Sequence, residues 1–137
     1  RSTEGGIVAL RDTNGDYRAD IIKYFGNMNE TKEGILWETG VAIHNGYIWA
    51  SNTTAVYRWP MPKGGALVPE GEPEMVVSGF PQQQSHASKA FTFDNKGNLY
   101  VAVGAPSNAC QTEERTPGSP GNRTLSFIGG TWWHLAL

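Results

Sequence analysis

Residues 40–60 read GVAIHNGYIWASNTTAVYRWP, and this stretch decides the fold. Asn45 and Gly46 stand between two apolar runs, and both residue types tolerate the positive φ that a type I′ turn requires. The stretch therefore predicts a hairpin of strands over 41–44 and 47–51, followed by a polar corner and a third strand over 55–59. We expect Pro60 to end that third strand.

The same plan returns further along the chain. Residues 82–111 read QQQSHASKAFTFDNKGNLYVAVGAPSNACQ, with a polar loop, a strand, a turn, a second strand and another polar loop. Residues 99–101 fall on residues 48–50 at an offset of 51. A period of about 50 residues, built from four short antiparallel strands, is the signature of a β-propeller blade.

Outside these two stretches, apolar runs predict further strands over 5–10, 21–25 and 75–78, while 26–39 is expected to be a loop. The predicted fold is all-β: a propeller segment of two to three four-stranded antiparallel blades over 1–121, and an atypical tail over 122–137. Because propellers close with four to eight blades, we expect the working protein to be longer. The alternative is a small β-sandwich or a stack of sheets.

The composition is that of a soluble globular protein: 137 residues, 39% hydrophobic and 18% charged. A net charge of −2 without a basic cluster excludes an electrostatic footprint for nucleic acid. No apolar run approaches the ~18 residues that membrane insertion needs. The chain opens on Arg1 without a signal-peptide pattern, which is typical of a processed or partial chain and leaves the compartment open.

One polar loop has oxygen side chains at alternating positions. Counted from the first, they occupy positions 1, 3, 5 and 9, and they are Asp12, Asn14, Asp16 and Asp20. This alternation points oxygens at a hard cation such as calcium. An EF-hand is excluded, because Tyr17 stands at position 6 and Lys23 at position 12. Either a calcium-stabilised turn or a solvated Asx-turn remains.

Polar side chains flank the predicted strands within 82–111. Because antiparallel neighbours bring the loop before one strand and the loop after the next to the same sheet edge, these side chains should gather on one rim. They are His86, Lys89, Asn108 and Gln111.

Several of these runs together carry a family resemblance. They are HASKAFTFDNKGNLYVAVGAPSNACQ from His86, RTPGSPG from Arg115, ALRDTNGDYRAD over 9–20 and TAVYR over 54–58. Across residues 6–121 the chain resembles the sorbosone dehydrogenase branch of the soluble quinoprotein sugar dehydrogenases. The resemblance implies a six-bladed propeller, secreted or periplasmic, that binds pyrroloquinoline quinone and calcium. It implies oxidation of a small-molecule sugar, and it leaves the electron acceptor open.

By this resemblance, His86 matches the family's catalytic histidine, the base that removes a hydroxyl proton while hydride passes to the quinone. A neutral imidazole suits that task, because its ordinary pKa of ~6.5 lies near working pH. The implied cofactor-binding residues are Lys89, Asn108, Gln111 and Arg115. Lys89 lies near the place of an arginine in relatives, although the spacing from the histidine is one residue shorter here.

The group that orients the histidine differs from the family pattern. Relatives carry an aspartate after the second strand, where this chain has Gly104, Ala105 and Pro106. Asn108 or Gln111 would then substitute as a hydrogen-bond partner, or this branch works without the carboxylate.

Structural roles compete with each of these assignments. A histidine in a polar loop is usually a surface residue, and His44, on a predicted strand, is expected to be structural. The aromatic residues either stack on a sugar or pack between blades; they are Trp37, Trp49, Trp59, Tyr57 and Tyr100. From relatives we would expect a partner for the single Cys110 after residue 121, but the sequence has no second cysteine. A non-catalytic propeller module is the alternative function.

Overall fold

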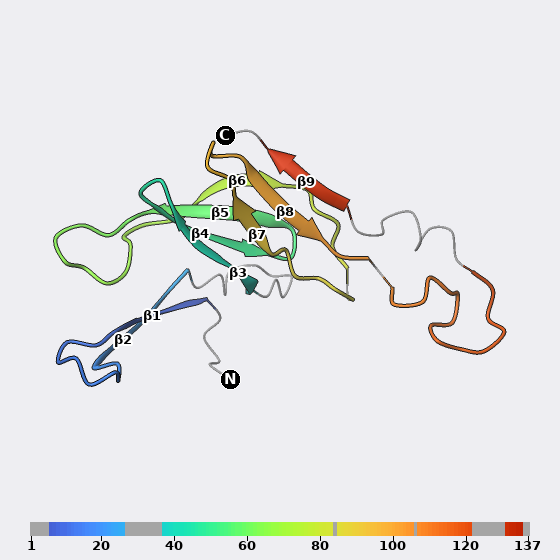
Figure 1. Ribbon diagram of the computed structural model, residues 1–137, viewed down its shortest axis with the longest axis horizontal. Helices are drawn as coiled ribbons and strands as arrows, with labels where there is room; N and C mark the ends of the chain where they lie inside the picture. Colours follow the sequence, from blue (N-terminus) through green and yellow to red (C-terminus); the bar gives the residue numbers. More distant parts are fainter. Residues whose placement is uncertain (1–5, 27–36, 84, 106, 122–130, 136–137) are drawn as a thin grey trace.

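All regular structure in the described residues is β-strand, which confirms the all-β class. The computed structural model describes residues 6–26, 37–83, 85–105, 107–121 and 131–135, and of 37–39 and 131–135 only the backbone. Within these ranges three antiparallel sheets contain two, four and three strands. Figure 1 labels their strands and colours them along the sequence from blue to red. No helix in these ranges is long and apolar enough to cross a membrane.

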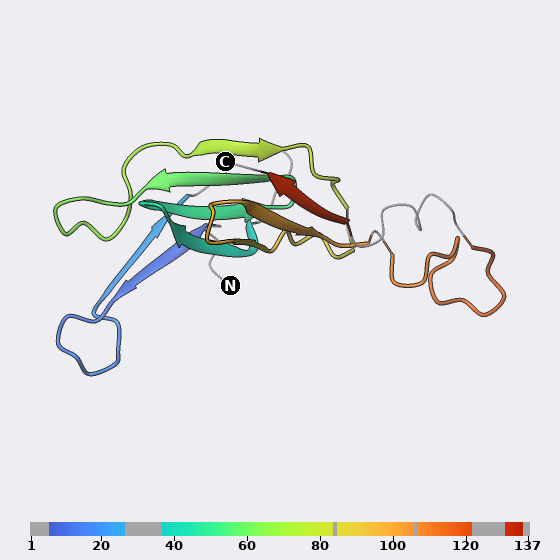
Figure 2. The same cartoon turned by 45° about the horizontal axis from the view of Figure 1, so that its top comes forward.

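The first sheet is a hairpin of β1 (Ile7–Arg11) and β2 (Ile21–Phe25). The second strand has the predicted bounds, and the first begins and ends slightly later than predicted. The hairpin carries the Asp12 loop at its tip, where it extends away from the other sheets (Figures 1 and 2).

The second sheet is a meander of four strands in sequence order. The strands are β3 (Trp37–His44), β4 (Tyr47–Asn52), β5 (Ala55–Pro60) and β6 (Glu74–Ser78). Asn45 and Gly46 have φ of 47° and 77°, which confirms the predicted turn. β3 begins earlier than predicted, within the expected loop, because Trp37 pairs with Asn52 across an irregularity in register.

The third sheet consists of β7 (Phe91–Phe93), β8 (Leu99–Val103) and β9 (Thr131–Leu135). β7 and β8 form the predicted hairpin, with Phe93 opposite Leu99. β9 was not predicted. It lies in the segment set apart as a tail, yet it pairs with β8 along five residues.

The core lies between the second and third sheets. Trp49 and Val56 are buried with Leu99, Val101 and Val103, the residues of one face of β8. The buried apolar side chains of the two sheets therefore contact one another and form a single core.

Aromatic rings join the two sheets. Phe93 stacks on His44 with ring centroids 4.1 Å apart and meets Trp49 edge-on at 4.8 Å. His44 is therefore structural, as expected. Trp49 and Trp59 are each only 1% exposed, so these two aromatic residues pack inside the protein and present no surface for a sugar.

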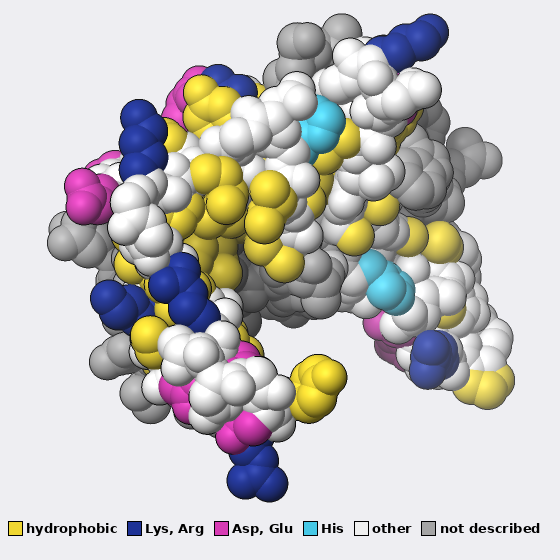
Figure 3. Space-filling view, turned by 60° about the vertical axis from the view of Figure 1, so that its left-hand side comes forward, with side chains coloured by type: hydrophobic (Ala, Val, Ile, Leu, Met, Phe, Trp, Pro, Cys, Tyr) yellow, Lys and Arg dark blue, Asp and Glu magenta, His cyan; other side chains and the backbone are white. Residues whose placement is uncertain are grey.

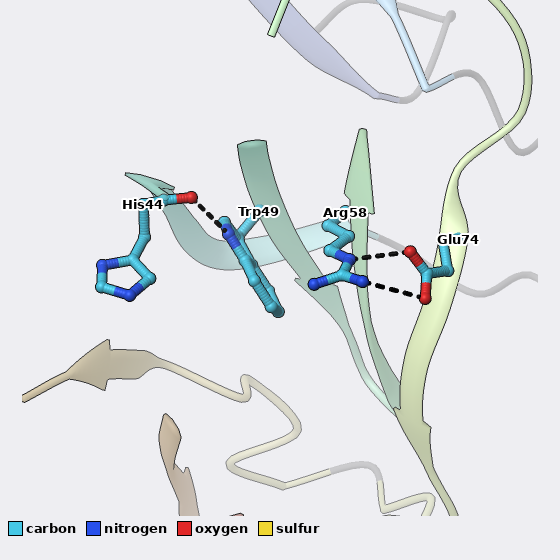
Figure 4. A network of polar contacts seen from close by, with 4 residues as sticks. All are labelled: His44, Trp49, Arg58 and Glu74. Atoms are coloured by element: carbon cyan, nitrogen blue, oxygen red, sulfur yellow. Dashed lines mark hydrogen bonds and ion pairs between the residues drawn. The ribbon is translucent and has the colours of Figure 1, made fainter. Parts of the chain in front are cut away.

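Polar contacts hold the second sheet across its strands (Figure 4). Arg58 forms a two-pronged ion pair with Glu74, with its Nε 2.7 Å from Glu74 Oε2. The same guanidinium lies over the ring of Tyr47, and the indole Nε1 of Trp49 donates to the carbonyl of His44 at 3.1 Å. These contacts fix β4 against β3, β5 and β6.

The order β3-β4-β5-β6 is that of a propeller blade, and β7-β8-β9 repeats its first three strands. In the described residues the sheets do not close into a ring. The all-β class is thus established, and the propeller remains an interpretation.

Candidate functional site

His86 lies in the turn between β6 and β7, with its side chain exposed. Its backbone has φ 51°, which is uncommon for a residue other than glycine. The ring atom Nδ1 lies 2.9 Å from the carbonyl oxygen of Ala105 and 3.2 Å from Ser85 Oγ. A carbonyl only accepts hydrogen bonds, so in the neutral ring Nδ1 carries the proton and Nε2 has the free lone pair. This arrangement leaves Nε2 able to accept a proton.

The segment after β8 supplies the orienting contact. The resemblance implies an orienting aspartate at the positions of Gly104, Ala105 and Pro106, and it is the backbone carbonyl of Ala105 that contacts His86 Nδ1. A Cβ added at Gly104 would lie 2.5 Å from His86 Cβ, so this close approach requires glycine. Neither substitute named from the sequence, Asn108 or Gln111, makes this contact with Nδ1.

Lys89 is not on the rim with His86. It is fully buried, and its ammonium donates to the carbonyl of Ala87. The hydroxyl of Ser51, on β4, donates to the Lys89 carbonyl at 2.6 Å. Lys89 thus ties the segment before β7 to the second sheet.

The loop after residue 106 holds the remaining predicted ligands. The side-chain amide of Gln111 donates to the carbonyls of Thr116 and Ser119 within the same loop, and Arg115 is exposed. The backbone N–H of Asn108 donates to Glu114 Oε1 at 2.9 Å. Gln111 thus stabilises its own loop, whereas Asn108 and Arg115 lie beside Glu114.

Glu114, which is not among the predicted site residues, lies beside Asn108 in this loop. Hydrogen bonds from Asn108, backbone first and then side chain, lower the pKa of the Glu114 carboxyl, and the charges of Arg115 and His86 lower it further. A carboxylate therefore lies within electrostatic reach of His86. No sequence signal marks it, because a glutamate in a polar loop is usually only solvated.

The predicted quinone ligands do not converge in the described residues. Lys89 presents no surface to a ligand and Gln111 binds its own loop, while Asn108 and Arg115 lie beside Glu114. These residues do not form a cradle for a large anionic quinone, and the cofactor remains a prediction.

The Asp12 loop is held by its own hydrogen bonds. Asp12 accepts from the backbone N–H groups of Asn14, Gly15 and Tyr17 at 2.7–3.0 Å. Asp20 Oδ2 accepts from the backbone and hydroxyl of Thr13, both at 2.7 Å. The pKa of the Asp12 carboxyl is lowered chiefly by the Gly15 N–H, and that of Asp20 by the Thr13 hydroxyl.

These contacts are those of the Asx-turn alternative. Asn14 Nδ2 lies 3.4 Å from Asp16 Oδ2 and 3.5 Å from Asp20 Oδ1, which brings the predicted calcium ligands together on one exposed loop. Among the described residues, no group of three or more His, Cys, Asp or Glu is placed to hold a metal ion. Calcium therefore remains a prediction that rests on oxygen chemistry and spacing.

An apolar groove lies elsewhere on the surface. It has a volume of about 500 Å³ and is lined by β1, by Val41 and Ile43 of β3, and by residues 61, 62 and 65–67. Figure 3 shows hydrophobic side chains gathered on one face of the molecule. The groove contains none of the predicted site residues.

Comparison with known proteins places the chain in no family. No protein-family model, no curated protein and no solved structure matches it.

Proposed function

We propose that this chain is part of a quinone-dependent sugar dehydrogenase in which His86 is the general base. The observation that carries the proposal is the bond between His86 Nδ1 and the Ala105 carbonyl, which leaves an exposed Nε2 to accept the proton of a sugar hydroxyl. Glu114 would stabilise the imidazolium that forms. The resemblance of residues 6–121 to the sorbosone dehydrogenase branch supplies the substrate class.

The proposed architecture is a propeller of which this chain provides two to three blades. The meander β3–β6 and its partial repeat in β7–β9 support it. The resemblance implies pyrroloquinoline quinone as hydride acceptor, calcium, and a periplasmic or secreted location. In this proposal further blades would hold the quinone, because Lys89 and Gln111 are engaged elsewhere.

The test is dye-linked oxidation of aldoses by the parent protein, supplied with the quinone and calcium. We expect His86→Asn to lower kcat by at least about 10²-fold, as loss of a general base does. Gln82→Asn, at a nearby exposed residue, is the matched control and should leave kcat unchanged. Full activity of the His86 variant would contradict the proposal.

A second candidate function is a non-catalytic propeller module that binds a ligand or acts as a scaffold. The burial of Lys89 favours it, because the one cation near the histidine in sequence is not available to a cofactor. This candidate predicts that the complete protein does not bind the quinone, which equilibrium dialysis would measure.

A further inference from the structure

The side-chain amide of Gln83 stands at a convergence of carbonyl groups beside His86. Gln83 Nε2 lies 2.9 Å from the Ser85 oxygen and 3.0 Å from the His86 oxygen. It also lies 2.9 Å from the oxygen of Gly104 and 3.4 Å from that of Ala105. Two of these carbonyls belong to the turn that carries His86, and two to the segment that follows β8.

Four carbonyl dipoles with their negative ends toward one point favour a donor there. An amide nitrogen has two N–H groups, so it donates to two of the four oxygens at a time. The reversed amide would place Oε1 against all four oxygens, which fixes the orientation. Gln83 Oε1 is itself buried and lacks a hydrogen-bond partner among the described residues. The hydrogen bonds that Nε2 makes to the two segments thus outweigh the cost of leaving Oε1 without a partner.

The distance between these two segments determines which ring nitrogen of His86 carries the proton. The Ala105 carbonyl both approaches the Gln83 amide and accepts a hydrogen bond from His86 Nδ1–H. If the segments separate, the imidazole loses its carbonyl partner, and Nε2–H, the usual tautomer of a solvated histidine, becomes available.

We propose that Gln83 is the positioning residue of the His86 base, clamping the Ala105 carbonyl against the imidazole so that Nε2 stays unprotonated. That His86 is a base rests on the function proposed above, whereas the tautomer that Gln83 fixes does not depend on it.

The test measures the tautomer of His86 in the full chain by long-range ¹H–¹⁵N correlation of the imidazole, with signals assigned by their loss in His86→Gln. We expect the Nδ1–H form in the wild type. Gln83→Glu keeps the shape but sets carboxylate oxygens against four carbonyl oxygens, so the tautomer ratio should move toward Nε2–H by roughly tenfold, the loss of about one hydrogen bond. Gln82→Glu adds the same charge at an exposed neighbour and should leave the ratio unchanged.

Gln83→Lys is a second variant that tests the same contact. Its ammonium restores N–H donors toward the carbonyls, so we expect it to retain the Nδ1–H form. An unchanged tautomer in folded Gln83→Glu would overturn the proposal, as would an Nε2–H wild type. If Gln83→Glu does not fold, shown by loss of the ring-shifted signals of Phe93, then Gln83→Lys decides: Nδ1–H supports the clamp and Nε2–H overturns it. Loss of the tautomer effect leaves the His86→Asn activity test unaffected, so the two failures are distinguishable.

Discussion

Asp94 organises the turn between β7 and β8 through a single carboxylate. It accepts hydrogen bonds from Asn98 Nδ2 at 2.6 Å, from the Lys96 N–H at 2.9 Å and from the Tyr100 hydroxyl at 3.2 Å. Chiefly because of the Asn98 side chain, the pKa of Asp94 is lowered from 3.8 to about 2. The ionised carboxylate is therefore bound more strongly in the folded turn than in the unfolded chain.

We expect Asp94→Ala to lower Tm at near-neutral pH. A depressed pKa contributes stability that is fully present above the ordinary value of 3.8 and is lost as pH falls through about 2. The Tm difference between wild type and variant should therefore narrow across that window, as thermal melts followed by circular dichroism would show. Glu72→Ala, at an exposed carboxylate, is the control. A Tm difference that does not change with pH would contradict the assigned role.

Some contacts around His86 could not be predicted from the sequence. The antiparallel topology predicts His86, Lys89, Asn108 and Gln111 on one rim. Lys89 is instead buried, and the Ser51 hydroxyl on β4 binds its backbone carbonyl. Ala105 acts through its backbone carbonyl, and the Gln83 side-chain amide donates to backbone carbonyls. Backbone groups are common to every residue, so the sequence contains no signal for either role.

At the scale of elements, the Asp12 loop tests the calcium prediction. We expect Ca²⁺ to shift the amide signals of residues 12–20 with a Kd of roughly 10⁻⁴ to 10⁻³ M, the range of weak oxygen-ligand sites. Asp20→Asn should remove the shifts, and removal of Ca²⁺ by a chelator should reverse them. Nuclear magnetic resonance titration measures both effects.

Glu70→Gln, which removes an exposed carboxylate outside the loop, is the matched control and should titrate as the wild type does. Unchanged amide signals up to about 10 mM Ca²⁺ would contradict the calcium prediction. The Asx-turn hydrogen bonds alone would then stabilise the loop.

Most strands could be predicted because local signals agree with the tertiary structure. The Asn45–Gly46 turn and the repeat at an offset of 51 predict two hairpins that the structure contains, although β3 begins earlier than predicted. β9 lacked such a signal: residues 131–135 read TWWHL, and their state depends on pairing with β8, which lies far away in sequence.

At the scale of the whole molecule, Gly40 lies where the second sheet packs against the third. A Cβ at this buried position would clash with Ser51 Oγ of the same sheet and lie 2.7 Å from Phe91 Cδ1 of the third sheet, closer than side chains pack. We expect Gly40→Ala to lower the free energy of unfolding by roughly 2 kcal/mol, because an added methyl group overpacks this contact and displaces Ser51, Phe91 or both. Urea unfolding followed by tryptophan fluorescence measures it.

Gly121→Ala is the control, since the nearest atom to an added Cβ there is 3.9 Å away. Equal effects of the two substitutions would mean that close packing at Gly40 does not limit the approach of the sheets. The propeller interpretation depends on this packing, because neighbouring blades must meet face to face.

The late pairing of β9 has a consequence for synthesis on the ribosome. The β3–β6 meander is local and is complete once residue 78 has emerged, whereas β8 waits for residues 131–135 to receive its outer neighbour. At the usual rate of translation this delay is roughly 2 to 6 seconds. Throughout that interval the N–H and C=O groups along one edge of β8 are unpaired. This edge can then pair with a strand of another nascent chain, which would promote co-aggregation.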